Sequence, residues 1–188
     1  MWPKEKMVEY LKAHLKENRF KHTLGVVKAA EELSKKYGCD ENKAKLGALL
    51  HDVAKNMCDE EIIEILKKEN YKLDFLIKNN PQIMHGFCSA YIAKHVMNVT
   101  DEEVLQAIIY HTTGKEDMTI LEKVIYLADF IEENRVYPGV EELRKLAKED
   151  LDKALLKAFD NTIEFVVKKG EYLHLDTIKA RNYILKNM

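Results

Sequence analysis

Apolar residues recur every three or four positions along most of the chain, which is the period of one face of an α-helix. A clear example follows Pro3, where Met7, Leu11 and Leu15 form one stripe. Alternation typical of strands is nearly absent, and only 7 Gly and 3 Pro interrupt the 188 residues. The pattern predicts an all-α fold, a bundle of roughly eight to ten helices.

Capping and breaking residues set the predicted helix boundaries. Asp40 is a predicted N-cap, and Gly38 has the place of a C-terminal capping glycine. Two capping boxes are predicted, Thr100 with Glu103 and Thr119 with Glu122. Helices are expected over residues 20–37, 41–56, 83–98, 100–111 and 119–133, with another from residue 59 and shorter and longer ones to the C-terminus, broken at Gly170.

Composition limits the class of protein. The length fits one domain, and 46% hydrophobic with 33% charged residues provides a core and excludes disorder. A net charge of −2 gives no electrostatic reason to expect nucleic acid or a membrane as partner. No run of about 18 apolar residues and no secretory leader is evident. Three widely spaced cysteines predict free thiols, so we expect a soluble, cytoplasmic protein.

Six residues carry the candidate chemistry: His22, His51, Asp52, His85, His111 and Asp129. Asp129 lies within a strongly apolar helical stretch, where an unpaired buried carboxylate is very costly. A cation is therefore expected beside it, either a metal ion or an Arg or Lys side chain. His111 lies on an inward-facing apolar stripe, where a lone histidine is more often a core residue than a ligand. Taken singly, neither residue decides between a metal site and a structural role.

The stretch "GALLHDVAK" favours the metal site. On a helix, His51 shares a face with the small residues Ala44, Gly47 and Ala48, which leave room for a ligand. The neighbouring Asp52 has two oxygens and could bridge two metal ions. Lys55 stands four residues after His51, and Arg19 three residues before His22, so both could point toward a group bound by the metal. The alternative for both cations is a solvated position on the helix.

Four imidazoles and two carboxylates favour iron, manganese, zinc or a similar transition metal over calcium or magnesium. With neutral histidines this set carries a charge of −2, and two divalent ions would leave about +2 in a pocket that also holds Arg and Lys. Such a pocket suits a phosphate group, and a metal pair could hold a hydroxide and stabilise the leaving oxygen. The sequence therefore predicts a metal-dependent phosphohydrolase if the six residues meet.

The order H…HD…H…H…D on helices resembles the HD-domain metal-dependent phosphohydrolases. The stretches RFKHT, LLHDVAK, HGF, YHTTG, DFIEENR and PGVEELR, which span nearly the whole chain, are similar to those of the YqeK family. The resemblance implies symmetrical hydrolysis of diadenosine tetraphosphate to two ADP by a metal-bound hydroxide. It also implies an iron-type centre, with manganese, cobalt or zinc as alternatives. One HD-type domain over residues 1–188 is expected, with a metal-site core at about 18–135 and C-terminal helices at 136–188 lining the nucleotide side.

The resemblance also implies a role for each site residue. His22, His51, Asp52 and Asp129 match the core metal ligands, and His85 and His111 complete a second metal or hold phosphate. The expected catalytic group is Asp52, His51, His85, His111 and Lys55. The expected substrate contacts are Arg19, Lys55, His85, His111, Thr112, Thr113, Arg135, Tyr172 and Thr177. In the last segment, Leu175 stands where the family commonly has proline.

Several alternatives stay open. Arg135 could pair with Glu132 or Glu133 instead of substrate, and the stretch 132–134 is interpreted as solvated surface. The protein could act on another nucleotide, as a monophosphatase, a deoxynucleotide triphosphohydrolase or a guanosine tetraphosphate hydrolase. It could also be a signalling module that binds nucleotide without turnover. The expected small-molecule partners are a dinucleoside polyphosphate and its ADP product, and homodimerisation is left open.

Overall fold

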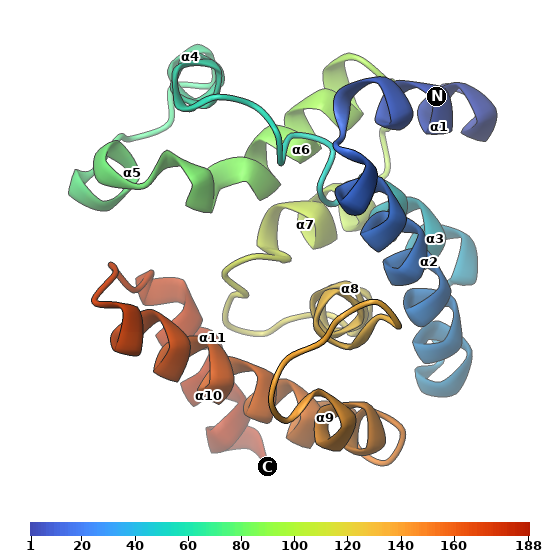
Figure 1. The fold of residues 1–188 in the computed structure, drawn as a ribbon, viewed down its shortest axis with the longest axis vertical. Coiled ribbons are helices and arrows are strands. Elements are labelled where there is room, and N and C mark those ends of the chain that lie inside the picture. The colour runs from blue at the N-terminus through green and yellow to red at the C-terminus, as the bar shows by residue number, and fades with distance from the viewer.

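The computed structural model describes all 188 residues as eleven α-helices and one short 3-10 helix, with no strands (Figure 1). The all-α prediction is confirmed, and the helix count is one above the expected range. The additional helix is short and begins where the Asp74 carboxylate accepts from the Ile77 amide. The elements are α1 (Lys4–His14), α2 (Glu17–Tyr37), α3 (Glu41–Leu50), α4 (Asp59–Lys68), α5 (Phe75–Asn79), η1 (Pro81–Met84), α6 (His85–His95), α7 (Glu102–Tyr110), α8 (Ile120–Ile131), α9 (Val140–Ala147), α10 (Leu151–Lys169) and α11 (Leu175–Asn187).

Most of the predicted caps are present. The Asp40 carboxylate accepts from two amides in the first turn of α3. Gly38 ends α2 in the left-handed region, at a φ of 75°, which glycine adopts without strain. Thr119 and Glu122 form the predicted capping box at the start of α8. At α7 the prediction is wrong by one residue, because Asp101 rather than Thr100 accepts the first free amides.

The third helix is shorter than predicted, and this changes the setting of the candidate residues. It ends at Leu50, and residues 51–56 continue as tight turns. His51 Nδ1 donates to Ala48 O over 2.6 Å, and this carbonyl would otherwise accept from the Asp52 amide. The Ala54 amide in turn donates to Ser89 Oγ over 3.1 Å. The side chains of this segment are therefore placed by turns, not by the helical spacing that we had expected.

The core surrounds α8, whose residues 124–128 are fully buried. On one side α8 packs against α2 and α7, and α3 packs against α2, α7 and α8. On the other side α9 and α10 pack against α8, and α11 packs on α10 (Figure 1). One region beside this core contains the N-terminal part of α2, the start of α6, and the C-terminal ends of α3, α7 and α8. No helix of the protein combines the length and the apolar character needed to cross a lipid bilayer.

Candidate metal centre and adjoining cavity

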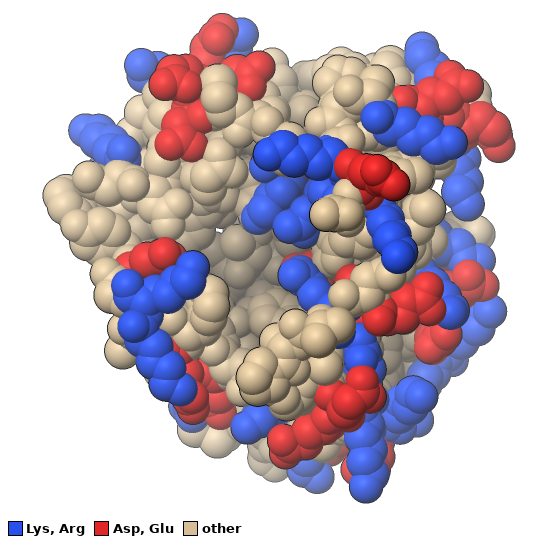
Figure 2. Space-filling view, viewed as in Figure 1, with Lys and Arg blue, Asp and Glu red and all other residues tan.

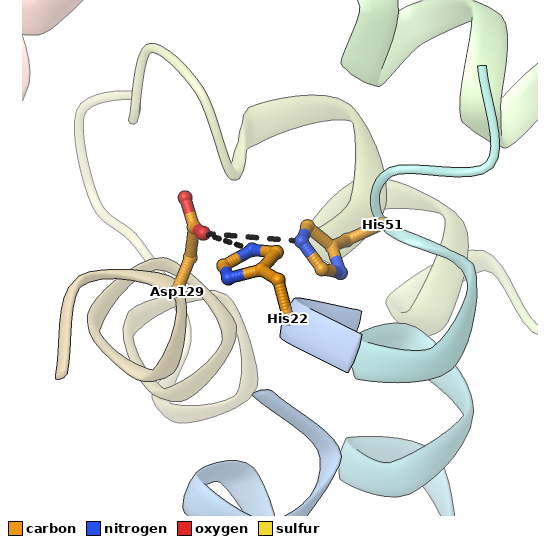
Figure 3. A group of neighbouring side chains, drawn as sticks. All are labelled: His22, His51 and Asp129. Carbon is orange, nitrogen blue, oxygen red and sulfur yellow. Dashed lines mark ion pairs between the residues drawn. The ribbon is translucent and has the colours of Figure 1, made fainter. Parts of the chain in front are cut away.

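The fold brings the six candidate residues together. His22 comes from α2, His51 and Asp52 from the turns after α3, His85 from the start of α6, His111 from the residue after α7, and Asp129 from α8. The ligand atoms of His22, His51 and Asp129 lie within 4.8 Å of one another, and Figure 3 shows these side chains converging. A second group within the same limit is His51, Asp52 and His111. Segments up to 107 residues apart in the sequence therefore form one cluster.

All four imidazoles direct the same ring nitrogen, Nε2, toward the cluster. Each Nδ1 lies against an oxygen that can only accept: Ala48 O for His51 at 2.6 Å, Gln82 O for His85 at 2.7 Å, Ile108 O for His111 at 2.7 Å, and Glu132 Oε1 for His22 at 3.1 Å. Each Nδ1 therefore carries the proton, and each Nε2 directs a lone pair toward the cluster. This is the arrangement in which histidine binds a metal ion.

The two oxygens of Asp52 face two different pairs of histidines. Oδ2 lies 3.3 Å from His51 Nε2 and 3.8 Å from His22 Nε2. Oδ1 lies 3.0 Å from His85 Nε2 and 3.5 Å from His111 Nε2. A single buried carboxylate thus joins two sets of nitrogen donors, which is the geometry required of a ligand that bridges two metal ions.

Asp129 has one of its predicted partners, an arginine side chain, and it also lies beside two histidines of the cluster. Its Oδ1 lies 2.8 Å from His22 Nε2 and 4.0 Å from His51 Nε2 (Figure 3). Arg135 Nη2 lies 2.5 Å from the same oxygen, and Arg135 Nε donates to the Asp129 carbonyl over 2.8 Å. The expected alternative partners of Arg135, Glu132 and Glu133, are therefore wrong. Arg135 is bound to the metal-site carboxylate instead.

The donor set fits a transition-metal ion. The Nε2 atoms of His22 and His51 are buried and have no hydrogen-bond partner. The Nε2 atoms of His85 and His111 lie only 3.0 Å apart, so two lone pairs face each other. Lone pairs in this arrangement repel each other unless a cation or a proton lies beside them. A divalent ion beside each pair of histidines would satisfy these nitrogens, and the mixed nitrogen and oxygen donors suit iron, manganese, cobalt or zinc.

Burial and charge set the protonation of the cluster. Burial lowers the pKa of His111 to about 4, so this imidazole is neutral at neutral pH. Burial opposes protonation of His51, but the carboxylates of Asp52 and Asp129 outweigh it and raise its pKa. Burial also opposes ionisation of both carboxylates, yet the adjacent histidines, and Arg135 in the case of Asp129, hold each pKa well below its usual range. Both carboxylates are therefore charged and available as ligands.

A cavity of about 740 Å³ opens onto the cluster. Four of the predicted substrate contacts lie in its wall beside the ligands: Arg19, Lys55, Thr112 and Arg135. Arg19 Nη1 lies 2.7 Å from Asp52 Oδ2, and Lys55 Nζ lies 3.3 Å from His85 Nε2. Figure 2 shows a hollow on this face with Lys and Arg side chains along part of its rim. The wall thus offers cations next to the candidate metal ligands, and cations in this position suit phosphate oxygens.

Three predicted contacts do not line this cavity. The hydroxyl of Thr113 is buried and donates to Gly114 O over 3.0 Å. Tyr172 is exposed, and its ring packs edge-on against Phe75 with centroids 5.2 Å apart. Thr177 is buried in the first turn of α11. The final segment therefore packs beside the cavity wall instead of forming it.

Sequence reasoning missed much of the wall opposite the ligands. It comes from α8, the loop before α9, and α10, and consists of Phe130, Tyr137, Pro138, Asn161, Thr162, Glu164, Phe165, Val166 and Lys168. The buried stripe of α10, which includes Leu155 and Ala158, continues at helical spacing to Phe165, whose ring is 56% exposed. This stripe extends beyond the core. An exposed apolar residue in such a stripe indicates that another group packs on it, which is the feature of the sequence that points to this wall.

Glu132 was also misplaced by the sequence reasoning. It was interpreted as solvated surface, but it is buried and receives a hydrogen bond from His22. Because α8 ends at Ile131 with an extended backbone at Glu132, the chain turns and directs this side chain inward. Neighbouring Glu133, in contrast, is exposed and pairs with Lys28, as expected of a surface residue.

Comparison with known proteins supports this geometry. The model of the HD domain family matches residues 19–134, which include all six candidate ligands. Proteins named symmetrical bis(5'-nucleosyl)-tetraphosphatase from Halalkalibacterium halodurans and Bacillus subtilis are each 41% identical, over 96% and 97% of both chains. A crystal structure described as a "predicted HD superfamily hydrolase involved in NAD metabolism" from Clostridium acetobutylicum is 48% identical and covers both chains fully, with a TM-score of 0.97. The chain therefore belongs to the HD-domain hydrolases and, within them, to the family of the symmetrical bis(5'-nucleosyl)-tetraphosphatases.

Proposed function

We propose that this protein hydrolyses diadenosine tetraphosphate symmetrically and releases two molecules of ADP. The observation that carries the proposal is the position of Asp52, whose two oxygens face two pairs of histidines at the floor of a cation-lined cavity. The names of the relatives that match nearly the whole chain support the choice of substrate. In this reaction the oxygen of water forms a bond to an inner phosphorus, the bond from that phosphorus to the central bridging oxygen breaks, one ADP leaves with that oxygen, the other ADP carries the new oxygen, and a proton is released.

The proposed ligands are His22, His51, Asp52, Asp129, His85 and His111, with Asp52 shared between the two halves of the site. We propose iron first, with manganese, cobalt or zinc as alternatives, because the donors are nitrogens and carboxylate oxygens. When bound, such an ion supplies a coordinated water of lowered pKa and positive charge next to the phosphoryl oxygens.

The cations of the cavity wall would hold the polyphosphate. Arg19 and Arg135 each bind a metal-site carboxylate through one part of the guanidinium, so their remaining N–H groups are oriented beside the ligands. Burial lowers the pKa of Lys55, so a phosphate group beside its ammonium would stabilise the charged form. Thr112 Oγ1 lies 3.3 Å from His85 Nε2 and can turn toward a phosphate oxygen.

The proposed domain organisation places hydrolysis and nucleotide binding in one domain over residues 1–188. The core at about 18–135 would supply the ligands, and α10, with the loop before α9, would supply the wall against which a nucleoside lies. The cavity falls in the range of roughly 300–1,000 Å³ that is typical of small-molecule sites. All three cysteines are free thiols, which suits the proposed cytoplasmic location.

The proposal is tested by incubating metal-loaded protein with diadenosine tetraphosphate and separating the products by chromatography. Two ADP as the only products would support it. ATP with AMP would mean cleavage of an outer P–O–P bridge and would contradict symmetrical cleavage. No turnover of this substrate, with release of nucleoside, triphosphate or pyrophosphate from other nucleotides, would assign the protein to another HD-domain reaction.

Replacing Phe165 should weaken substrate binding without impairing the chemistry. Its exposed ring faces the cavity, and stacking of a base on an aromatic ring contributes about 1–3 kcal/mol. We expect Phe165→Ala to raise KM about tenfold and to leave kcat nearly unchanged. Val167→Ala is the matched control, since Val167 is equally exposed on α10 but does not line the cavity. A fall in kcat at unchanged KM would contradict a binding role.

Metal affinity should decrease as the pH falls. Metal binding requires neutral imidazoles, and the pKa of His51 in the metal-free protein is raised, so protons compete with the ion there. Below that pKa the affinity for Co²⁺ should fall about tenfold per pH unit, with release of a proton on binding. Titrations of metal-freed protein with Co²⁺ at about pH 8 and about pH 6 would measure this. Equal affinities would exclude His51 as a ligand.

A further inference from the structure

Glu132 lies outside the six candidate ligands but is one of the most deeply buried charged residues, 1% exposed. Its Oε1 accepts from His22 Nδ1 over 3.1 Å, from a residue 110 positions away in the sequence. The Nδ1 atoms of the other three histidines donate to backbone carbonyls three residues before them. His22 is therefore the only candidate ligand whose ring orientation depends on another side chain.

The Glu132 carboxylate is fixed on every side. Its Oε2 accepts from Asn134 twice, from the backbone amide over 2.7 Å and from Nδ2 over 2.8 Å. Arg144 Nη2 donates to the Glu132 carbonyl over 2.6 Å. A Cβ at Gly25 would come within 2.1 Å of Oε2, so α2 leaves space for this carboxylate one turn beyond His22. These contacts hold the carboxylate so that Oε2 faces Asn134 and Oε1 faces His22.

We propose that Glu132 is a positioning residue for the metal centre, and this inference rests on the metal site of the proposed function. It holds the proton on His22 Nδ1, directs Nε2 toward the ion, and strengthens the ring as a ligand through its negative charge. Carboxylate partners of this kind commonly change metal affinity by about 10–100-fold when they are removed. Asn134 and Gly25 act through Glu132, one by hydrogen bonding and the other by leaving space.

The variant Glu132→Gln tests the inference because an amide has only one oxygen and cannot accept from both His22 and Asn134. If its oxygen accepts from Asn134, its NH₂ group faces His22 Nδ1 and forces the ring proton onto Nε2, the atom that must bind the ion. If the amide is rotated by about 180°, its NH₂ group faces the two N–H donors of Asn134. We therefore expect the affinity for Co²⁺ to fall by about 10–100-fold, with a changed visible absorption of the bound ion.

The measurement is a titration of metal-freed, full-length protein with Co²⁺, followed by visible absorption. The matched control is Glu133→Gln, since Glu133 is exposed and pairs with Lys28 over 2.6 Å. The control should bind Co²⁺ like the wild type. Binding by Glu132→Gln within about twofold of the wild type would overturn the inference. A wild-type protein that binds no Co²⁺ would instead contradict the metal site of the proposed function.

A second variant covers the case in which Glu132→Gln does not fold to the native helical content. Asn134 is exposed, so Asn134→Ala removes one of the two hydrogen-bond donors to Oε2 while leaving the core untouched. We expect Co²⁺ binding several-fold weaker than in the wild type, because the carboxylate is less firmly held. An unchanged affinity and absorption spectrum in this variant would also overturn the inference.

Discussion

The Asp52→Ala variant is expected to lose at least about 10³-fold in kcat/KM while keeping its fold. Asp52 is charged at neutral pH, because its pKa is held well below the usual range, and it faces both pairs of histidines. Without it, both halves of the site lose an anionic ligand at once. The structure tolerates the change because Arg19 is partly exposed and the vacated space opens to the cavity. Kinetics with diadenosine tetraphosphate, together with circular dichroism, would measure the two properties.

A matched control tests whether the loss of activity is specific to Asp52 or follows from removing any carboxylate. Asp152 pairs with Lys123 over 2.6 Å on the surface of α10, is about half exposed, and does not line the cavity. The Asp152→Ala variant should retain wild-type kinetics. Full activity of Asp52→Ala would exclude the proposed metal site as the source of catalysis, whereas unfolding of that variant would show that the carboxylate is needed for the fold.

Removal of the metal should abolish turnover and lower the melting temperature. The proposed ligands come from both ends of the HD region, so a bound ion would link α2, the turns after α3, and α8. An ion at about 100 times its dissociation constant stabilises the folded state by about 2.7 kcal/mol, which corresponds to roughly 5–10 °C for a chain of this length. Melting curves of chelator-treated and reloaded protein would measure the shift.

The same experiment has an internal control. The shift should be strongly reduced in Asp52→Ala, because that variant lacks the shared ligand. Turnover that persists in protein shown by elemental analysis to be free of metal would refute the proposed chemistry. Restoration of activity by one metal ion among iron, manganese, cobalt and zinc would identify the ion that the site uses in vitro.

The residue types of the centre were predictable from the sequence, but their supporting contacts were not. His22, His51, His85 and His111 stand in distinctive local contexts, and a carboxylate in the apolar stretch around Asp129 demands a partner. The structure brings all of these residues into one cluster. Pattern alone could not show that the chain leaves the helix at His51, since that depends on a hydrogen bond from its ring to Ala48.

Contacts between distant segments account for the remaining differences. Glu132 and Glu133 are adjacent and chemically identical, yet one is buried against His22 and the other pairs with Lys28 at the surface. Only the space at Gly25 and the end of α8 distinguish them, and neither is visible as a periodic pattern. Likewise, the spacing within α10 indicates that Phe165 needs a partner, but only the packing of α10 on α8 places it in the cavity wall.

Two separate stretches of the chain form the wall of the cavity. Every candidate ligand lies between residues 22 and 129, whereas Asn161, Phe165 and Lys168 on α10 lie beyond the matched HD region. Under the proposed function, substitutions on α10 would reshape the pocket that selects a substrate while the proposed metal centre keeps its composition. Such a separation would let nucleotide preference change through substitutions in one C-terminal helix, without any change in the proposed ligands.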